Sequence, residues 1–173
     1  MAHTCFNASS QFKKSWALSQ NSKEYFSKAK KYAEACASLC NDVHCGKQSI
    51  INEHLIRCEI IDFDLARFFD VVTNESCKKL VQFLDDCIRI YREEEKEGRS
   101  FQLFSTQANY YIIRAYQGDI SISQREWARL LEQQERINRG SGKKRDKYCE
   151  QIKQNLEVLF DDNVELNKLG FIF

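Results

Sequence analysis

One long stretch, residues 48–72, limits most strongly what this chain can fold into. Apolar residues recur there at steps of three and four, which places them on one face of a helix. They are Ile51, Leu55, Cys58, Ile61, Leu65, Phe68 and Val72, with a second set at Ile50, Ile56, Ile60, Phe63 and Phe69. A helix that is apolar on most of its circumference needs neighbours on several sides. The stretch therefore predicts a central helix.

The same helical spacing recurs along most of the chain. It predicts further helices at about 21–42, 75–96, 100–117 and 124–138, and another from about 143 to 160. No strand pattern of convincing length and no solenoid-type repeat is present. We therefore predict an all-α fold: a compact bundle of five to seven helices without a sheet, forming a single domain over 1–173 with a flexible basic turn near 139–143.

Two local signals predict helix ends after residue 100. Gly118 follows an apolar helical pattern, and glycine is favoured just past a helix end. Ser123 and Glu126 have the spacing of a capping box, with Ile122 and Trp127 at the hydrophobic-staple positions around it. These residues predict a helix that begins just after Ser123.

The composition is that of a globular chain. Of 173 residues, 43% are hydrophobic and 29% charged, and the net charge of +1 creates no global field that would select nucleic acid or a membrane. No apolar run approaches the roughly 20 residues that a membrane span needs. We expect no membrane span.

The eight cysteines have two possible roles, disulfides or buried thiols. The first ten residues, MAHTCFNASS, lack the basic start and apolar run of a secretory signal. Reduced thiols are the rule in the cytosol, and free cysteine is among the most buried residue types. We therefore expect a cytoplasmic protein with reduced cysteines. Five of them fall at helical core positions: Cys36, Cys40, Cys58, Cys77 and Cys87.

One group of cysteine and histidine residues has spacing compatible with a metal site. Cys36 and Cys40 lie one helical turn apart, as do His54 and Cys58, and an antiparallel pair of helices would bring the four together. Soft ligands of these types suit zinc or copper. The alternative, which the loose spacing favours, is small core cysteines beside a surface histidine, with no cofactor.

A basic stretch lies at residues 136–147. Residues 136–154 hold seven Lys and Arg against two Asp and Glu, and a glycine turn interrupts the run. Bases beside a helix N-terminus can hold phosphates. The sequence thus offers a weak nucleic-acid or phosphate contact through Arg139, Lys143, Lys144 and Arg145, against the simpler interpretation of a solvated loop.

Catalytic signatures are missing from the sequence. It contains no Glu-x-x-His pair for a di-iron bundle, no G-x-S-x-G, no P-loop and no G-x-G-x-x-G. Aromatic residues, by contrast, make up 12% of the chain and exceed what a minimal bundle core consumes. Aromatic side chains dominate binding hot spots. The candidates for partner contact are Trp16, Tyr110, Tyr111, Phe171 and Phe173.

The sequence therefore favours a non-enzymatic, protein-binding helical module, such as an adaptor, inhibitor or regulatory partner. A zinc- or copper-dependent protein or enzyme that uses the Cys/His group is the alternative, and a nucleic-acid or phosphate contact through 136–147 comes third. The apolar segment that starts at Leu169 either docks on the core or is a short exposed recognition element. The oligomeric state and the identity of the partner stay open.

Overall fold

The computed structural model describes residues 31, 35, 48–68, 70–93, 100–138 and 146–172, and it confirms the all-α fold class over these residues. They form five α-helices and a short 3-10 turn, and no strand occurs among them. The elements are α3 (Gln48–Phe68), α4 (Asn74–Glu93), α5 (Ser100–Tyr116), α6 (Ile120–Asn138), α7 (Asp146–Phe160) and η2 (Leu166–Lys168).

The chain divides into two compact units, residues 1–72 and 73–173, and each is described by itself. Of the first unit, the structure describes mainly α3. The second unit contains α4 to α7 and η2. The expectation of a single domain, and that of a central position for 48–72, stay predictions.

Helix α3 confirms the long helix predicted from the sequence but ends at Phe68, four residues earlier than expected. Asp70 adopts a left-handed backbone conformation with φ of 55°. Its N–H donates to the carbonyl of Arg67, and the N–H of Val71 donates to the carbonyl of Ala66. This pair of bonds is a Schellman motif, which satisfies the last carbonyls of the helix and turns the chain away.

Among the α3 side chains that the structure describes, the buried apolar ones come from both sets of the sequence. Ile56, Ile60 and Phe63 are buried, as is Ile61 from the first set. Asp64 is also buried and forms an ion pair with Arg67 on the next turn. A polar residue on the apolar face is thus paired, as burial of a charge requires.

Helix α4 begins with a reciprocal cap that the sequence signals only faintly. The hydroxyl of Thr73 accepts a hydrogen bond from the N–H of Ser76 (3.1 Å), and the Ser76 hydroxyl accepts one from the N–H of Thr73 (3.1 Å). This is a capping box with serine in place of the usual glutamate or glutamine.

Removal of this cap gives a first test of the fold. We expect Thr73→Ala to lower the free energy of unfolding by about 1 kcal/mol, because a helix N-terminus loses one of its few side-chain acceptors. Thr73→Ser keeps the hydroxyl and should retain most of the stability. Chemical denaturation of the three proteins measures the effect, and equal losses in both variants would contradict the assignment of the cap.

The junction between α5 and α6 corrects the predicted start of α6. Gly118 does end the preceding helix, at φ of 92°, with its N–H bonded to the carbonyl of Ala115. Helix α6, however, begins at Ile120, so Ser123 lies inside it and donates its hydroxyl to the carbonyls of Tyr111 (2.8 Å) and Asp119 (3.0 Å). The N–H of Asp119 also donates to the carbonyl of Arg114, which completes a Schellman motif at the end of α5. The predicted capping box was wrong because the chain turns into α6 directly from this motif.

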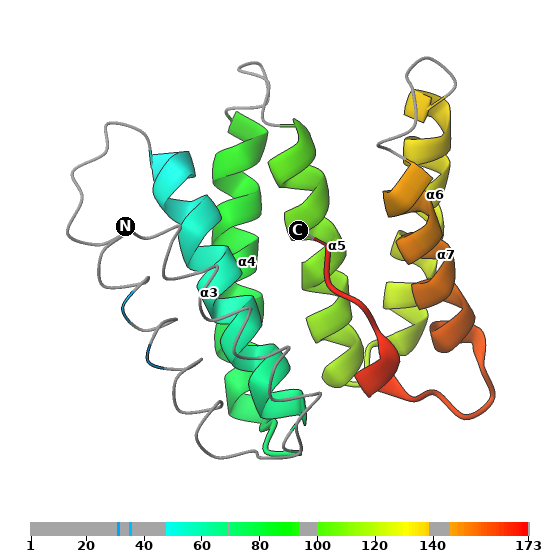
Figure 1. The fold of residues 1–173 in the computed structure, drawn as a ribbon, viewed down its shortest axis with the longest axis horizontal. Helices are drawn as coiled ribbons and strands as arrows, with labels where there is room; N and C mark the ends of the chain where they lie inside the picture. Colours follow the sequence, from blue (N-terminus) through cyan, green and yellow to red (C-terminus); the bar gives the residue numbers. More distant parts are fainter. Residues whose placement is uncertain are drawn as a thin grey trace. The chain divides into compact units, whose positions relative to one another are not determined.

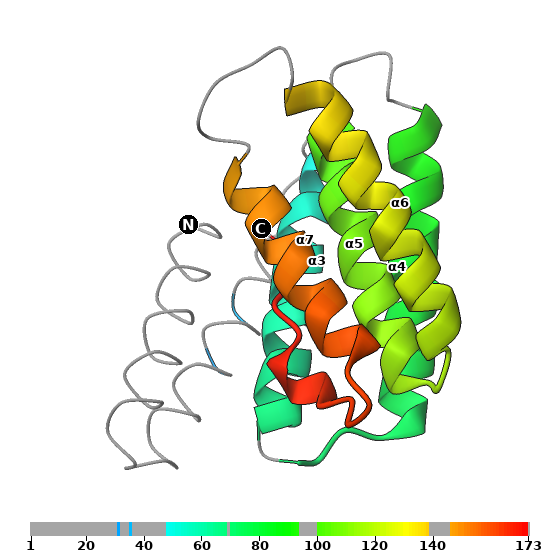
Figure 2. The same ribbon diagram turned by 90° about the vertical axis from the view of Figure 1, so that its right-hand side faces the viewer.

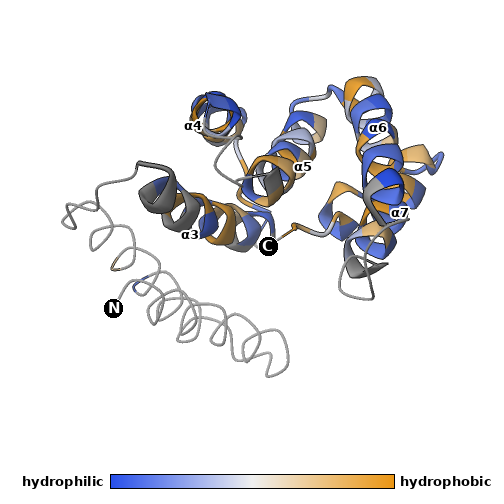
Figure 3. Ribbon diagram, turned by 90° about the horizontal axis from the view of Figure 1, so that it is seen from above, coloured by the Kyte–Doolittle hydropathy of each residue, from blue (hydrophilic) through white to orange (hydrophobic). Residues whose placement is uncertain are grey.

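Helices α4 to α7 run up and down in succession, with each helix packed on the next along the chain (Figure 1). Each carries both apolar and polar residues, as one-sided burial requires (Figure 3). Helix α5 lies between α4 and α6 and is buried on most of its circumference. Within residues 73–173 it therefore occupies the central place. The buried residues of α4 are Cys77, Leu80, Leu84, Cys87, Ile88 and Tyr91.

The described cysteines behave as core residues. Cys77 and Cys87 are 1% exposed and Cys149 is 7% exposed, and none of the three forms a disulfide. Burial, with the nearby charge of Asp86, raises the pKa of Cys87 to about 12 from its usual 9.0.

No helix in the described part of the chain combines the length and the apolarity that a membrane span requires.

The raised pKa predicts that Cys87 is chemically inert in the folded protein. A pKa of about 12 in place of 9.0 lowers the thiolate fraction at pH 8 by roughly 1,000-fold, and the thiolate is the reactive form. Alkylation with iodoacetamide, followed by peptide mass spectrometry, should label Cys87 only after denaturation. Labelling of Cys87 in the native protein at the rate of a free thiol would contradict its burial.

Candidate protein-binding surface

Two adjacent tyrosines of α5, both singled out by the sequence, lie half-buried at the surface of the second unit. The rings of Tyr110 and Tyr111 meet edge to face, with centroids 5.1 Å apart and planes at 83°. Edge-to-face pairs of this kind are worth about 0.5–1.5 kcal/mol beyond the area that they bury. The two rings therefore form one pre-arranged aromatic surface.

Arg114, one helical turn after Tyr110, holds the Tyr110 ring in place. Its Nη1 donates to the phenol oxygen of Tyr110 (3.0 Å), and the guanidinium carbon lies 5.8 Å from the ring centroid. The same guanidinium donates through Nε to Asp119 Oδ2 (2.7 Å). Arginine fixed by a carboxylate and stacked on an aromatic ring loses little side-chain entropy on binding a partner.

Tyr111 lies close to charged residues of both neighbouring helices. Burial raises the pKa of the Tyr111 phenol, and the charge of Glu126 on α6 adds to the rise. Arg92 of α4 and Arg129 of α6 act in the opposite direction. The charges of two guanidinium groups, one on each helix beside α5, therefore act on the phenol.

The charges that act on the Tyr111 phenol are those of two arginines, Arg92 and Arg129, and of one carboxylate, Glu126. Arg125 and Arg129 of α6 share one carboxylate, that of Glu126, at 3.2 and 3.6 Å. Both arginine side chains are more than 70% exposed, while Glu126 is 16% exposed. We call this surface the tyrosine–arginine face; its members are Tyr110, Tyr111, Arg92, Arg114 and Arg129.

A second feature of the same unit is the segment after α7, which returns along α5 and α7 (Figures 1 and 2). Leu169 and Ile172 are buried at 1% and 2% exposure, and Phe171 between them is half-buried. The sequence left two alternatives open for this segment: docking on the core, or a short exposed recognition element. Residues 169–172 dock on the core. We call residues 169–172 the docked segment.

Two buried asparagines hold the main chain of the docked segment. Asn155 of α7 donates to the carbonyl of Gly170 and accepts from its N–H, both at 2.8 Å. Asn109 of α5 makes the same two bonds with Ile172, again both at 2.8 Å. Both asparagines are 1% exposed or less.

Sequence reasoning missed these two asparagines, although a signal exists. Asn155 lies three residues after Ile152 and four before Leu159, so it occupies the apolar stripe of its helix. Asn109 lies three residues before Ile112 in the same way. A polar residue at a core position must find hydrogen-bond partners when it is buried. An asparagine within an apolar stripe therefore predicts that another segment of the chain bonds to its side chain.

The remaining predicted site residues lie outside what the structure describes. This holds for Trp16, Phe173, Cys36 and Cys40, and for the side chains of His54 and Cys58 on α3. It also holds for the proposed anion contacts Arg139, Lys143, Lys144 and Arg145. Among the described residues, no group of three or more His, Cys, Asp or Glu could hold a metal ion.

The chain was compared with protein families, with curated proteins and with solved structures. No family model, no curated protein and no solved structure matches the chain.

Proposed function

We propose that this chain is a non-enzymatic protein-binding module, whose tyrosine–arginine face holds an acidic segment of a partner protein. The observation that carries the proposal is the edge-to-face pair of Tyr110 and Tyr111, with the guanidinium of Arg114 bonded to the Tyr110 phenol. The charges of Arg92 on α4 and Arg129 on α6 act on the Tyr111 phenol. Tyrosine and arginine are, with tryptophan, the residues most enriched at binding hot spots.

The charge of the face defines the chemistry of the partner. A guanidinium group binds a carboxylate through two parallel hydrogen bonds, which gives both energy and orientation. Among the residues that the structure describes, Glu126 is the carboxylate paired with both Arg125 and Arg129. A guanidinium has five N–H donors, so the two arginines have capacity for further carboxylates. A helix or loop rich in Asp and Glu, with an apolar residue to cover the tyrosine rings, fits this surface.

The experiment compares three forms of the full-length chain as bait for extract from its native cells. One is the wild type, one carries Arg92→Glu and Arg129→Glu, and the control carries Lys78→Glu and Lys79→Glu. The control makes the same charge change at exposed positions near the other end of α4, roughly 20 Å along the helix from Arg92.

Partners identified by mass spectrometry are then tested as purified proteins. The proposal expects a partner that wild type and control retain and that the Arg92/Arg129 variant loses. It is contradicted if every retained protein binds the Arg92/Arg129 variant as well as it binds the wild type.

A further inference from the structure

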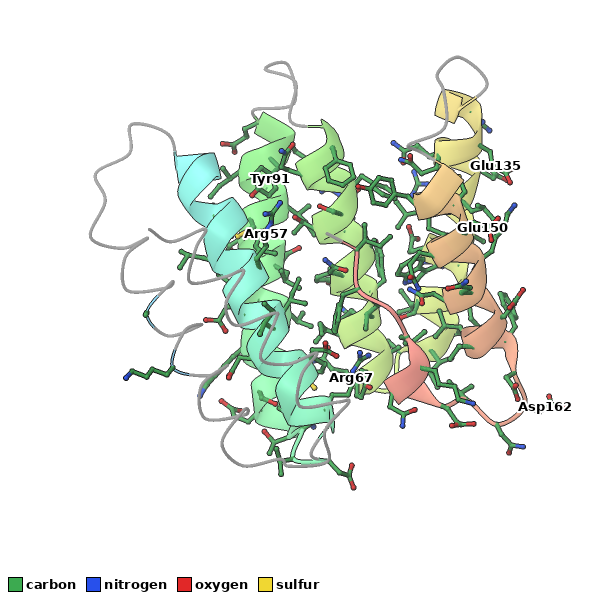
Figure 4. All side chains as sticks on the ribbon, in the orientation of Figure 1. Arg57, Arg67, Tyr91, Glu135, Glu150 and Asp162 are labelled. Carbon is green, nitrogen blue, oxygen red and sulfur yellow. The ribbon has the colours of Figure 1, made fainter. Side chains whose placement is uncertain are left out.

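Helix α7 ends in an exposed aromatic side chain among acidic residues. Phe160, the last residue of the helix, is 64% exposed, which is the highest fraction among the large hydrophobic side chains that the structure describes. Residues 157–165 contain two Glu and two Asp and no Lys, Arg or His. All four carboxylates are exposed, and Asp162 projects away from the helices (Figure 4). We call residues 157–165 the acidic end.

The charge at the end of α7 is the opposite of that at the ends of the other described α-helices. Each of those four carries an arginine in its last turn: Arg67, Arg92, Arg114 and Arg136. A cation there offsets the partial negative charge of a helix C-terminus. Helix α7 has no basic residue in its last turn, and Asp161 and Asp162 follow it directly. Of the four carboxylates, that of Glu165 is paired, with Lys168 at 2.7 Å. The acidic end thus keeps a net negative charge.

The acidic end has the composition that the tyrosine–arginine face requires of a partner. Its carboxylates can accept hydrogen bonds from the guanidinium groups of Arg92 and Arg129, and such charge-assisted bonds are stronger than neutral ones. The Phe160 ring can pack on the Tyr110 ring, since aromatic pairs gain energy beyond the area that they bury. Tyr110 is half-buried and Arg129 is 80% exposed, so both are accessible to a second molecule.

In one molecule the acidic end and the face lie on different sides of α6. The Gln124 side chain donates to the carbonyl of Leu159 at 2.6 Å, which places the end of α7 beside Gln124. At about 3.6 residues per turn, Arg129 lies about 140° further around α6 than Gln124. A second molecule is therefore needed to join the acidic end to the face.

On the basis of the proposed function, we infer that the partner of the tyrosine–arginine face is the acidic end of a second copy of this chain. Each copy has one face and one acidic end, so the contact is head to tail. It leaves a free face on one copy and a free acidic end on the other. Association then continues into chains of copies or closes into a ring.

Sedimentation velocity on the purified full-length chain, from micromolar to near-millimolar concentration, measures this association. The wild type should form dimers and larger species as the concentration rises. Two variants should each raise the dissociation constant by about tenfold or more: a face variant with Arg92→Gln and Arg129→Gln, and an end variant with Phe160→Ser and Asp162→Asn. A control with Lys78→Gln and Lys79→Gln makes the same charge change as the face variant and should associate as the wild type does.

A mixture of the two variants tests the head-to-tail contact itself. The end variant keeps an intact face, and the face variant keeps an intact acidic end. An equimolar mixture should therefore form a one-to-one dimer and no larger species, with an affinity within about threefold of the wild type. A mixture that stays monomeric overturns the inference, and so does a wild type that is monomeric at every concentration.

Two outcomes distinguish a wrong partner from a wrong binding face. A monomeric wild type removes the second copy as the partner, and the extract experiment then judges the proposed function alone. Loss of association in the face variant but not in the end variant also overturns the inference, because the face then binds a different segment, while the face itself is supported as a binding surface.

If circular dichroism shows that either variant has unfolded, dilution of the isotope-labelled wild type decides instead. The amide shifts of Arg129 and Phe160 should change together with concentration, because one contact involves both. A change at only one of them, or at neither, contradicts the inference.

Discussion

Replacing Asn155 with leucine is expected to lower the free energy of unfolding by about 3 kcal/mol, since each buried polar group left without a partner costs about 1–3 kcal/mol. The side chain is fully buried, and its amide makes three hydrogen bonds, two with Gly170 and one with Gln151. Leucine fills a similar volume but leaves the N–H and C=O of Gly170 unpaired beside an apolar group. Chemical denaturation measures the loss.

A matched control separates this effect from the general cost of an added leucine. Asn167 is exposed on η2, so Asn167→Leu should change stability by no more than about 0.5 kcal/mol. Amide exchange of Gly170 and Ile172 should accelerate in the Asn155 variant and not in the control. Similar stability in both variants would show that the asparagine bonds contribute little.

Asn155→Asp adds a pH readout to the same test. The introduced carboxyl lies beside the Gly170 carbonyl, and burial opposes its charged form, so its folded pKa should rise above the unfolded value of about 3.9. For an acid with a raised folded pKa, stability is present at low pH and is lost as the pH rises through that pKa. Relative to the wild type, this variant should therefore regain stability on acidification, because the protonated carboxyl again donates to the carbonyl. Asn155→Leu should show no such recovery.

Reversing the charge of Arg92 and Arg129 together should weaken binding of the partner by about 100-fold, or roughly 2.7 kcal/mol. Like charges placed against each other across an interface cost several kcal/mol, and the reversal also removes two guanidinium donors. Both side chains are exposed, so the free energy of unfolding should fall by no more than about 1 kcal/mol, most of it from the like-charge pair that Arg129→Glu would form with Glu126. Titration calorimetry with the purified partner measures the affinity.

Salt dependence supplies the control for this prediction. Binding to the wild type should weaken as ionic strength rises, because salt screens exposed charge pairs. The Lys78→Glu, Lys79→Glu variant should keep an affinity within about threefold of the wild type, since its charges lie roughly 20 Å along α4 from Arg92 and more than a Debye length away from it. Equal weakening by both reversals would indicate an effect of net charge rather than of this surface.

The sequence predicted the helical class and most helix positions because those depend on local spacing. The buried residues of α4 recur at three and four residues, and Cys77 and Cys87 fall on that stripe, as expected. Gly118 ended its helix for the predicted reason, the ease with which glycine adopts positive φ.

The sequence could not predict features in which one residue serves two neighbouring elements. Asp119 both completes the end of α5 and accepts the first bond of α6, from the N–H of Ser123. The capping pattern that begins at Ser123, four residues later, therefore gave the wrong start for α6. The end of α3 depends on a left-handed Asp70, a conformation that no apolar spacing signals. Asn109 and Asn155 find their ligand 63 and 15 residues further along the chain, and only the folded structure supplies that pairing.

Chemical-shift mapping on the isotope-labelled chain, with the unlabelled partner added, tests the proposed function most directly. The account predicts the largest amide shifts at Tyr110, Tyr111 and Arg129, with smaller ones at Arg92, and no shift at Lys78. Shifts confined to the end of α4 near Lys78, or to residues 169–172, would contradict binding through the tyrosine–arginine face.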